Sequence, residues 1–308
     1  MSKQIQKLTT LTGHHDSVYA LAQGSQPQEI FSAGSDGFVV RWDLEASVSS
    51  LPTHGRLVVR MPSSVYALCF IKEKNYMVVG QNYKGVHLID LIDNKEISSS
   101  SMTSSAIFDI QYFKEILFVG CGDGTLTMLN ANDLSTIKRL HLSNKSVRCL
   151  AINPLRNELA IGYSDSYIRV LDLETLSVKQ EIAAHTNSVF SLTYSPDNQY
   201  LLSGSRDAHL KIWRANEGYD LHQDIVAHLF TINHIIYSPD NQYFATCSKD
   251  KSVKLWCAED FKLLKVIDKA RYAGHGTSVN KLLWTSYYDM LLSCSDDNTI
   301  SVWNIMNL

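Results

Sequence analysis

Histidine, hydroxyl and carboxylate side chains, the parts of a hydrolase catalytic triad, recur together along this chain of 308 residues. Each of four tryptophans follows an aspartate by six residues, a serine or threonine by ten and a histidine by 28. A hydroxyl beside an imidazole and a carboxylate could act as a nucleophile. The four sets are His14, Ser32, Asp36 and Trp42; His185, Ser203, Asp207 and Trp213; His228, Thr246, Asp250 and Trp256; and His275, Ser293, Asp297 and Trp303.

The repetition of these sets argues against catalysis. An enzyme needs one active site, whereas this pattern occurs four times at constant offsets. A buried polar group without a partner costs about 1–3 kcal/mol, so residues that hydrogen-bond to one another must occur together. We therefore interpret the four sets as structural networks and predict that the chain is not an enzyme.

Three weaker copies fill the intervals between these sets. The segments GCGDGTLTML and GYSDSYIRVLDL keep the aspartate but carry leucine at the tryptophan position. Exchanging a whole polar network for apolar packing can be nearly neutral, whereas removing one member is not. The third unit has Ser101, Val119, Asp123 and Leu129 at the four positions, the fourth has Ser143, Ile161, Asp165 and Leu171, and the second is a looser copy around Asn82 that allows one inserted residue before Leu88 or Ile89.

Short β-strands are the elements expected to position these residues. Runs such as SVFSLTYS, QYLLSGS and AHLKIW are rich in β-branched, aromatic and aliphatic residues, and turn formers such as SPDN and SRDA separate them. No segment has a sustained helical period with caps at both ends. Seven such units favour a propeller that forms a single domain over 1–308. The predicted units are roughly 13–58, 59–100, 101–142, 143–183, 184–226, 227–273, and 274–308 together with 1–12.

The chain resembles the WD40-repeat family in the GH pairs that begin at Gly13 and Gly274, in the WD pair that begins at Trp42, and in its SxD turns. The resemblance covers all seven units and implies an all-β fold, a seven-bladed β-propeller with four antiparallel strands per blade. It implies that an N-terminal strand around residues 5–11 completes the last blade. It also implies that aspartate, histidine, hydroxyl and indole form a buried chain of hydrogen bonds.

The resemblance further implies which side chains face the top mouth of the central channel. In this family it is the residue after the conserved valine or isoleucine of each unit's first strand. Aromatic rings and arginine gathered at one rim are typical of binding hot spots, and the alternative is that they only plug the channel. The seven rim residues are Tyr19, Tyr66, Phe108, Arg148, Phe190, Asn233 and Asn280.

A second group of expected top-face residues precedes the turn aspartates. It includes Arg206 and Lys249, and the longer connection before the seventh unit adds Lys269, Arg271 and Tyr272. A basic sector beside aromatic side chains would suit an acidic peptide that contains aromatics, whereas scattered surface charges are the alternative interpretation.

These observations predict a non-catalytic scaffold that binds a protein or peptide on its top face. One alternative is a structural subunit that assembles through its sides or bottom. The other is an enzyme with its site at the channel mouth, which is disfavoured because the predicted rim contains no carboxylate or histidine.

Composition narrows the function classes further. The formal net charge of −3 disfavours a broad nucleic-acid-binding face. No stretch approaches the roughly 18 apolar residues of a membrane span, and the first residues lack the apolar run of a secretion signal. The six cysteines form no CxxC pair, so we expect reduced thiols in a cytoplasmic monomer rather than a disulfide framework. No cofactor or metal is predicted, because no metal-binding spacing relates the remaining histidines: His15, His54, His87, His141, His209, His222 and His234.

Overall fold

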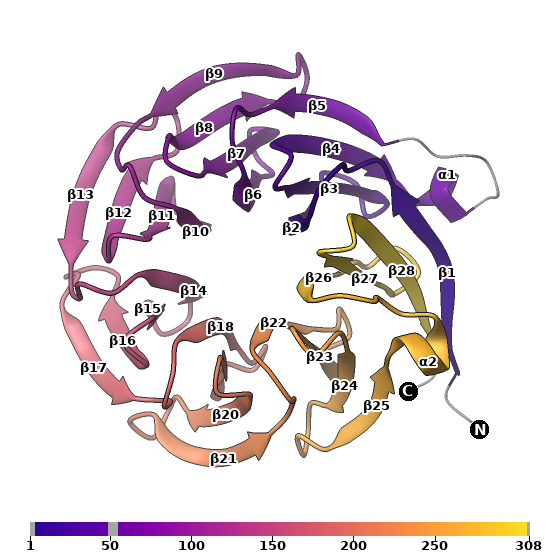
Figure 1. The fold of residues 1–308 in the computed structure, drawn as a ribbon. Coiled ribbons are helices and arrows are strands. Elements are labelled where there is room, and N and C mark those ends of the chain that lie inside the picture. The colour runs from indigo at the N-terminus through magenta and orange to yellow at the C-terminus, as the bar shows by residue number, and fades with distance from the viewer. Residues whose placement is uncertain (1–3, 49–54, 307–308) are drawn as a thin grey trace.

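Seven four-stranded antiparallel sheets stand like blades around a central channel (Figure 1). The computed structural model describes residues 4–48 and 55–306. In each blade the innermost strand faces the channel and the fourth lies at the outer edge. The predicted all-β, seven-bladed propeller is therefore confirmed.

Six blades follow chain order from the innermost strand outwards, and the seventh combines both ends of the chain. The strands are, by blade, β2 (Val18–Gln23), β3 (Glu29–Gly34), β4 (Phe38–Asp43) and β5 (Arg56–Arg60); β6 (Val65–Ile71), β7 (Tyr76–Gln81), β8 (Gly85–Asp90) and β9 (Lys95–Ser100); β10 (Ile107–Phe113), β11 (Ile116–Cys121), β12 (Thr125–Asn130) and β13 (Thr136–His141); β14 (Val147–Asn153), β15 (Glu158–Tyr163), β16 (Tyr167–Asp172) and β17 (Val178–Ala183); β18 (Val189–Tyr194), β19 (Tyr200–Ser205), β20 (His209–Arg214) and β21 (Asp220–Val226); β22 (Ile232–Tyr237), β23 (Tyr243–Ser248), β24 (Val253–Cys257) and β25 (Leu263–Ile267); and β26 (Val279–Trp284), β27 (Met290–Ser295), β28 (Thr299–Met306) and β1 (Gln4–Thr12).

The N-terminal strand closes the ring, as the family resemblance implied. β1 pairs antiparallel with β28, with Ile5 opposite Ile305 and Leu11 opposite Ile300. This pairing makes the first and last strands part of one sheet, so backbone hydrogen bonds join the two ends of the chain and close the ring.

The hydrophobic core is divided among the spaces between neighbouring blades. One cluster packs Val18 and Ile30 of the first blade against Leu292 and Val302 of the seventh. Because a neighbour covers each face of a blade, the middle strands are buried on both faces, and all six residues of β15 are buried.

Every innermost strand carries a shift of register at its second residue. In β2 the pairing with β3 passes from Val18 to Ala20, and the other six blades repeat this step. A residue skipped in this way has no cross-strand partner, and a bulge re-aims its side chain. The skipped residues are Tyr19, Tyr66, Phe108, Arg148, Phe190, Asn233 and Asn280.

The second blade departs from the prediction in one detail. Met77 pairs with Ile89, which gives the same spacing as Leu201 with Trp213 in the fifth blade. The blade therefore contains no inserted residue at this hairpin. Its turn differs instead, because Tyr83 at the aspartate position adopts a positive φ of 65°.

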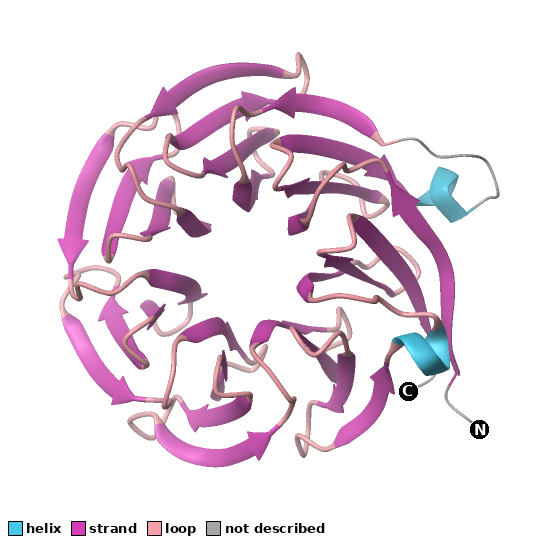
Figure 2. Cartoon of the chain, viewed as in Figure 1, coloured by secondary structure: helices cyan, strands magenta, loops and turns pink. Residues whose placement is uncertain are grey.

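Two short helices interrupt the described β-structure at the outer edge of the ring (Figure 2). They are α1 (Leu44–Val48) and α2 (Lys269–Tyr272). Asp268 caps α2 by accepting the Arg271 backbone N–H, a local signal that a search for long helical periods does not detect. Neither described helix has the length or the apolar character that a membrane crossing requires.

Candidate functional site at the channel mouth

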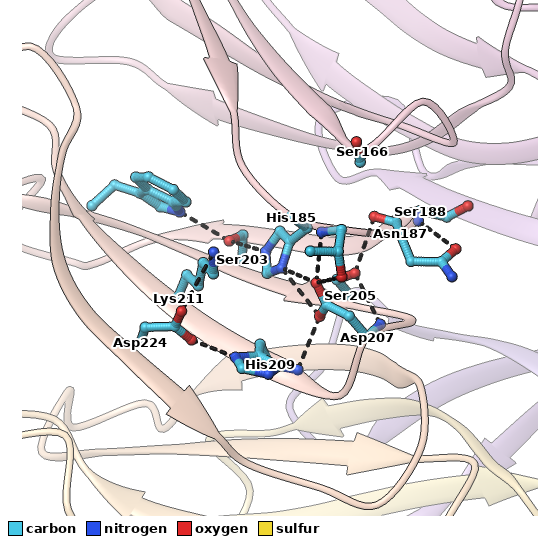
Figure 3. A network of polar contacts seen from close by, with 12 residues as sticks. Ser166, His185, Asn187, Ser188, Ser203, Ser205, Asp207, His209, Lys211 and Asp224 are labelled. Atoms are coloured by element: carbon cyan, nitrogen blue, oxygen red, sulfur yellow. Dashed lines mark hydrogen bonds and ion pairs between the residues drawn. The ribbon is translucent and has the colours of Figure 1, made fainter.

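In the fifth blade, His185 lies between Ser203 and Asp207 (Figure 3). Its Nδ1 is 3.0 Å from Asp207 Oδ2 and its Nε2 is 2.8 Å from Ser203 Oγ, which also accepts the Trp213 indole N–H at 2.9 Å. A carboxylate only accepts and an indole only donates, so every group is satisfied when Nδ1 carries the imidazole proton. Ser203 has no exposed surface, so its hydroxyl is not available to a substrate.

The same chain of contacts occurs in three further blades. Histidine Nδ1 contacts the aspartate, Nε2 contacts the hydroxyl and the indole donates to that hydroxyl, all at 2.7–3.0 Å. These sets are His14, Ser32, Asp36 and Trp42; His228, Thr246, Asp250 and Trp256; and His275, Ser293, Asp297 and Trp303.

The networks shift the titration of their members. Burial holds the pKa of His185 below its usual value, despite the neighbouring carboxylate, and the same holds for His14 and His228. Burial alone would raise the pKa of Asp207, but hydrogen bonds from His185 and from backbone N–H groups keep it well below its usual range. The pair therefore consists of a neutral imidazole and a carboxylate at neutral pH.

The fourth blade keeps its aspartate but changes the partners. Asp165 accepts from Ser143 Oγ at 2.6 Å and from Arg169 at 2.9 Å. Ser143 was the residue predicted at the histidine position. Arg169 is positively charged, whereas the imidazoles of the network blades are neutral. Its guanidinium lies 4.7 Å from the centre of the Tyr163 ring. The space is thus filled by a charged pair as well as by apolar groups.

The third blade corrects one alignment from the sequence. The carboxylate of Asp123 accepts from Thr103 Oγ1 at 2.8 Å, whereas Ser101 donates to the Lys84 carbonyl instead. The connection before this blade therefore places Thr103, two residues later than predicted, beside the turn aspartate.

All seven predicted rim residues line one cavity of about 390 Å³ at the mouth of the channel. Five of them form a continuous arc of four rings and one guanidinium. The rings of Tyr19 and Tyr66 are 4.8 Å apart, those of Tyr66 and Phe108 are 5.8 Å apart, and Arg148 follows between Phe108 and Phe190. The structure therefore brings the aromatic rim residues together on adjoining blades.

Arg148 is enclosed by this arc. Its guanidinium carbon is 3.7 Å from the centre of the Phe108 ring and 4.2 Å from that of Phe190. Its Nε is buried and has no hydrogen-bond partner within residues 4–48 and 55–306. Burial lowers the pKa of Arg148 to about 10, yet the group stays charged at neutral pH.

The two asparagines of the rim join neighbouring blades. Asn233 Nδ2 donates to the Val279 carbonyl at 2.8 Å, and Asn280 Nδ2 donates to the Val18 carbonyl at 3.0 Å and to Asp296 at 2.8 Å. Their amide donors are thus already engaged within the ring of blades, unlike Nε of Arg148.

The expected basic sector is more dispersed than the rim. Arg206 and Lys249 are exposed but do not line the mouth cavity. The connection with Lys269, Arg271 and Tyr272 forms α2, which packs on β1 at the outer edge (Figure 1). These three residues therefore do not adjoin the aromatic arc, which corrects the sequence-based placement.

Four polar residues of the channel were not predicted from the sequence. Gln111, Lys281, Asp109 and His234 line both the mouth cavity and a second cavity deeper in the channel. Three of the four immediately follow a rim residue. In a regular strand, successive side chains alternate between the two faces, so a residue that follows a rim residue would point away from the channel. The bulge at the rim residue interrupts this alternation and lets two successive side chains face the channel.

Two of these groups hold the ring together. Asp109 Oδ2 accepts the Leu150 backbone N–H of the next blade at 2.8 Å, and His234 Nδ1 accepts that of Leu282 at 3.3 Å. Burial holds the pKa of His234 well below its usual value. The mouth therefore does contain a carboxylate and an imidazole, contrary to the sequence-based expectation, but each is engaged with backbone.

The remaining predictions concern cysteines and metals. All six cysteines are free thiols, and four of them are buried. Within residues 4–48 and 55–306, no group of three or more histidine, cysteine or acidic side chains is arranged to hold a metal. His54 lies outside the described residues.

Comparison with known proteins identifies relatives of the chain. Protein groucho of Drosophila melanogaster is 20% identical over 71% of this chain, and periodic tryptophan protein 2 homolog of Mus musculus is 23% identical over 68%. The matched regions cover only 30% and 24% of those two proteins.

A solved structure and a family model agree with these matches. The WD40 beta propeller domain of Doa1 superposes with a TM-score of 0.84, at 18% identity, over 98% of this chain and 97% of that one. The family model "WD domain, G-beta repeat" matches residues 5–43, 176–214, 220–257 and 267–304, which together make up half of the chain. The chain therefore belongs to the WD40-repeat family.

Proposed function

We propose that this protein is a non-catalytic interaction scaffold that binds a partner protein through an acidic, aromatic-containing segment at the channel mouth. The observation that carries the proposal is Arg148. A guanidinium enclosed by two rings, with a buried Nε and no ion pair among the described residues, can receive a carboxylate from a ligand.

The surrounding rings support an aromatic neighbour for that carboxylate. Tyr19, Tyr66 and Phe108 form a preordered arc, so a ring inserted beside them gains stacking contacts without ordering loose side chains. Aromatic and arginine anchors surrounded by polar residues are typical of the energetically dominant part of an interface.

The absence of catalysis is supported by how the polar groups are used. Hydroxyls in the four networks are buried against indoles, and the acceptors of Asp109 and His234 near the mouth bind backbone N–H groups. A general base needs a free acceptor within reach of its substrate. We also propose a cytoplasmic location, because six free cysteines fit a reducing compartment.

A capture experiment tests the proposal. Immobilised wild-type protein and the Arg148→Gln variant are exposed to cell extract, and bound proteins are compared by quantitative mass spectrometry. We expect Arg148→Gln to reduce capture of specific partners at least about tenfold, since leaving a buried carboxylate unpaired costs about 2–5 kcal/mol. Arg139→Gln is the matched control, because Arg139 is exposed on the outer strand β13.

The alternative scaffold, which assembles through its sides or bottom, makes the opposite prediction. If capture survives alanine substitution of Tyr19, Tyr66, Phe108 and Arg148 together, the mouth is not the binding site. Folding of each variant is checked by its thermal unfolding curve.

A further inference from the structure

The propeller has another cavity, away from the channel, that no rim residue touches. It has a volume of about 750 Å³ and lies between the fifth and sixth blades. Rim residues stand at the beginning of each innermost strand, whereas Tyr194 and Tyr237 stand at the ends of β18 and β22. The cavity is lined by Tyr237 and by the turns that follow these ends, so it opens on the face opposite the mouth.

The preceding boundary, between the fourth and fifth blades, shows how such a space can be closed. Glu158, which is 1% exposed, accepts from the Tyr219 hydroxyl at 2.7 Å, and the Tyr194 hydroxyl is 2.8 Å from that of Tyr219. Arg156 and Lys179 each reach the same carboxylate at 2.8 Å. Five side chains thus form a paired network that fills the boundary.

The next boundary carries different residues at these places. Tyr200 begins β19 as Glu158 begins β15, and Tyr237 ends β22 as Tyr194 ends β18. Phe261 takes the loop position of Tyr219 and offers no hydroxyl. The buried Tyr237 hydroxyl consequently has no hydrogen-bond partner within residues 4–48 and 55–306, and the boundary stays open as a groove.

The charge around this groove is negative. Asp197 and Glu259 line it, and Asp240 lies one residue before the lining residue Asn241. These three carboxylates are exposed. Asp197 and Asp240 each accept a serine hydroxyl and a backbone N–H through Oδ1, but no lysine, arginine or histidine of the described residues forms an ion pair with any of the three. Carboxylates without a cationic partner attract cations through their charge, and neighbouring tyrosine rings attract cations through their faces.

We propose that this groove is a second binding site, which takes a basic segment of a partner protein that carries arginine or lysine next to apolar side chains. Charge complementarity selects this occupant: the carboxylates are exposed, and Tyr200, Ala258 and Leu264 add apolar surface to the lining. The volume lies within the range of about 300–1,000 Å³ that is typical of ligand sites. The scaffold then holds an acidic segment on one face and a basic segment on the other.

A binding titration tests this site directly. The probe is a fluorescein-labelled synthetic peptide that alternates arginine and leucine, and the companion probe replaces each arginine by glutamate. Fluorescence polarisation is recorded at low and at raised salt. We expect saturable binding of the arginine peptide only, and weaker binding at raised salt because exposed charges are screened.

Matched variants locate the bound peptide. Glu259→Lys combined with Asp197→Asn should weaken binding about tenfold. Glu217→Lys, a charge reversal in the corresponding loop of the fifth blade, should change affinity less than about twofold, because Glu217 does not line the groove. Glu259→Lys alone serves if the double variant is unstable, because Glu259 is exposed and makes no hydrogen bond among the described residues.

The outcomes that overturn the proposal are distinct. Absence of saturable binding, equal binding of the glutamate peptide, or unchanged affinity in the groove variants would each show that the groove is not a site for basic segments. Loss of binding in Arg148→Gln would place the peptide at the mouth and would also overturn it. None of these results bears on capture of acidic partners by Arg148.

Discussion

Two arcs of the ring stabilise the same blade shape in different ways. The first, fifth, sixth and seventh blades each contain a complete chain from carboxylate through imidazole and hydroxyl to indole. The second, third and fourth blades lack the imidazole and indole, and leucine or isoleucine occupies the tryptophan position. The backbone pairing is nevertheless the same, with Leu201 opposite Trp213 and Leu159 opposite Leu171.

This difference shows that the hydrogen-bonded chain from aspartate to tryptophan is one of several ways to fill the interior of a blade. What each blade requires is that a partly buried turn aspartate, where one is present, finds hydrogen-bond donors. In the fourth blade Arg169 and Ser143 satisfy Asp165, and in the second blade Tyr83 replaces the aspartate and is exposed. A network blade should therefore be sensitive to loss of one member, whereas the other blades should tolerate change at the equivalent position.

The largest expected effect comes from breaking one network. Asp207→Ala in the fifth blade should lower the free energy of unfolding by about 2–4 kcal/mol, because it leaves a buried imidazole half-paired. The matched variant Asp123→Ala in the third blade should lower it by less than about 1 kcal/mol, since Thr103 can turn to water. Urea unfolding measures both. Equal losses of unfolding free energy in the two variants would mean that the network blades do not depend more strongly on their aspartate than the other blades do.

Acid should weaken the network blades next. The pKa values of His14, His185 and His228 are lowered in the folded protein, so the unfolded chain binds protons first. Stability is therefore complete above the unfolded pKa of about 6.5 and declines as the pH falls below it, by up to about 2 kcal/mol between pH 7 and pH 6. Further loss follows near pH 4, because the pKa values of Asp207 and Asp250 are also lowered.

Thermal unfolding at a series of pH values measures this dependence. His185→Gln is the control variant and should show a shallower decline, since one titrating group is gone. A stability that stays constant from pH 7 to pH 5 would contradict the assignment of neutral, buried imidazoles.

The smallest expected effect is the coupling free energy between the imidazole and the carboxylate of one network, which a double-mutant cycle measures. The double variant His185→Ala with Asp207→Ala should cost about 1–2 kcal/mol less than the sum of the two single variants, because each single change already breaks their shared hydrogen bond. Asp123→Ala combined with His185→Ala should be additive, since the two residues belong to separate blades. Additivity in the first pair would show that the imidazole and carboxylate are not energetically linked.

Much of the fold could be predicted because hydrogen-bond partners must occur together. The tryptophans, hydroxyls and aspartates recur at offsets that reflect one repeated strand geometry, which together with the weaker copies indicated seven units, whereas the closure by β1 was implied by the family resemblance. The family resemblance implied which position faces the rim, and residues such as Tyr19 and Arg148 could then be located in every unit, because each unit begins its first strand in the same way.

Several features of the sites could not be predicted. Asp109 and His234 face the channel only because bulges interrupt alternation in the innermost strands. Thr103 rather than Ser101 reaches Asp123, since loop conformation decides which hydroxyl is near. The short α2 depends on the cap supplied by Asp268 and on packing against β1.

The sequence by itself determined the number of units, the residues of the four networks and the residues available to the rim, because these follow from local strand geometry repeated along the chain. Only the tertiary structure decided that Arg148 stands enclosed between two rings and that Tyr237 lines an open groove while Tyr194 lies in a closed network. Both outcomes depend on contacts between neighbouring blades, such as Arg148 with Phe108 and Tyr219 with Glu158, whose residues are 40 and 61 positions apart in the sequence.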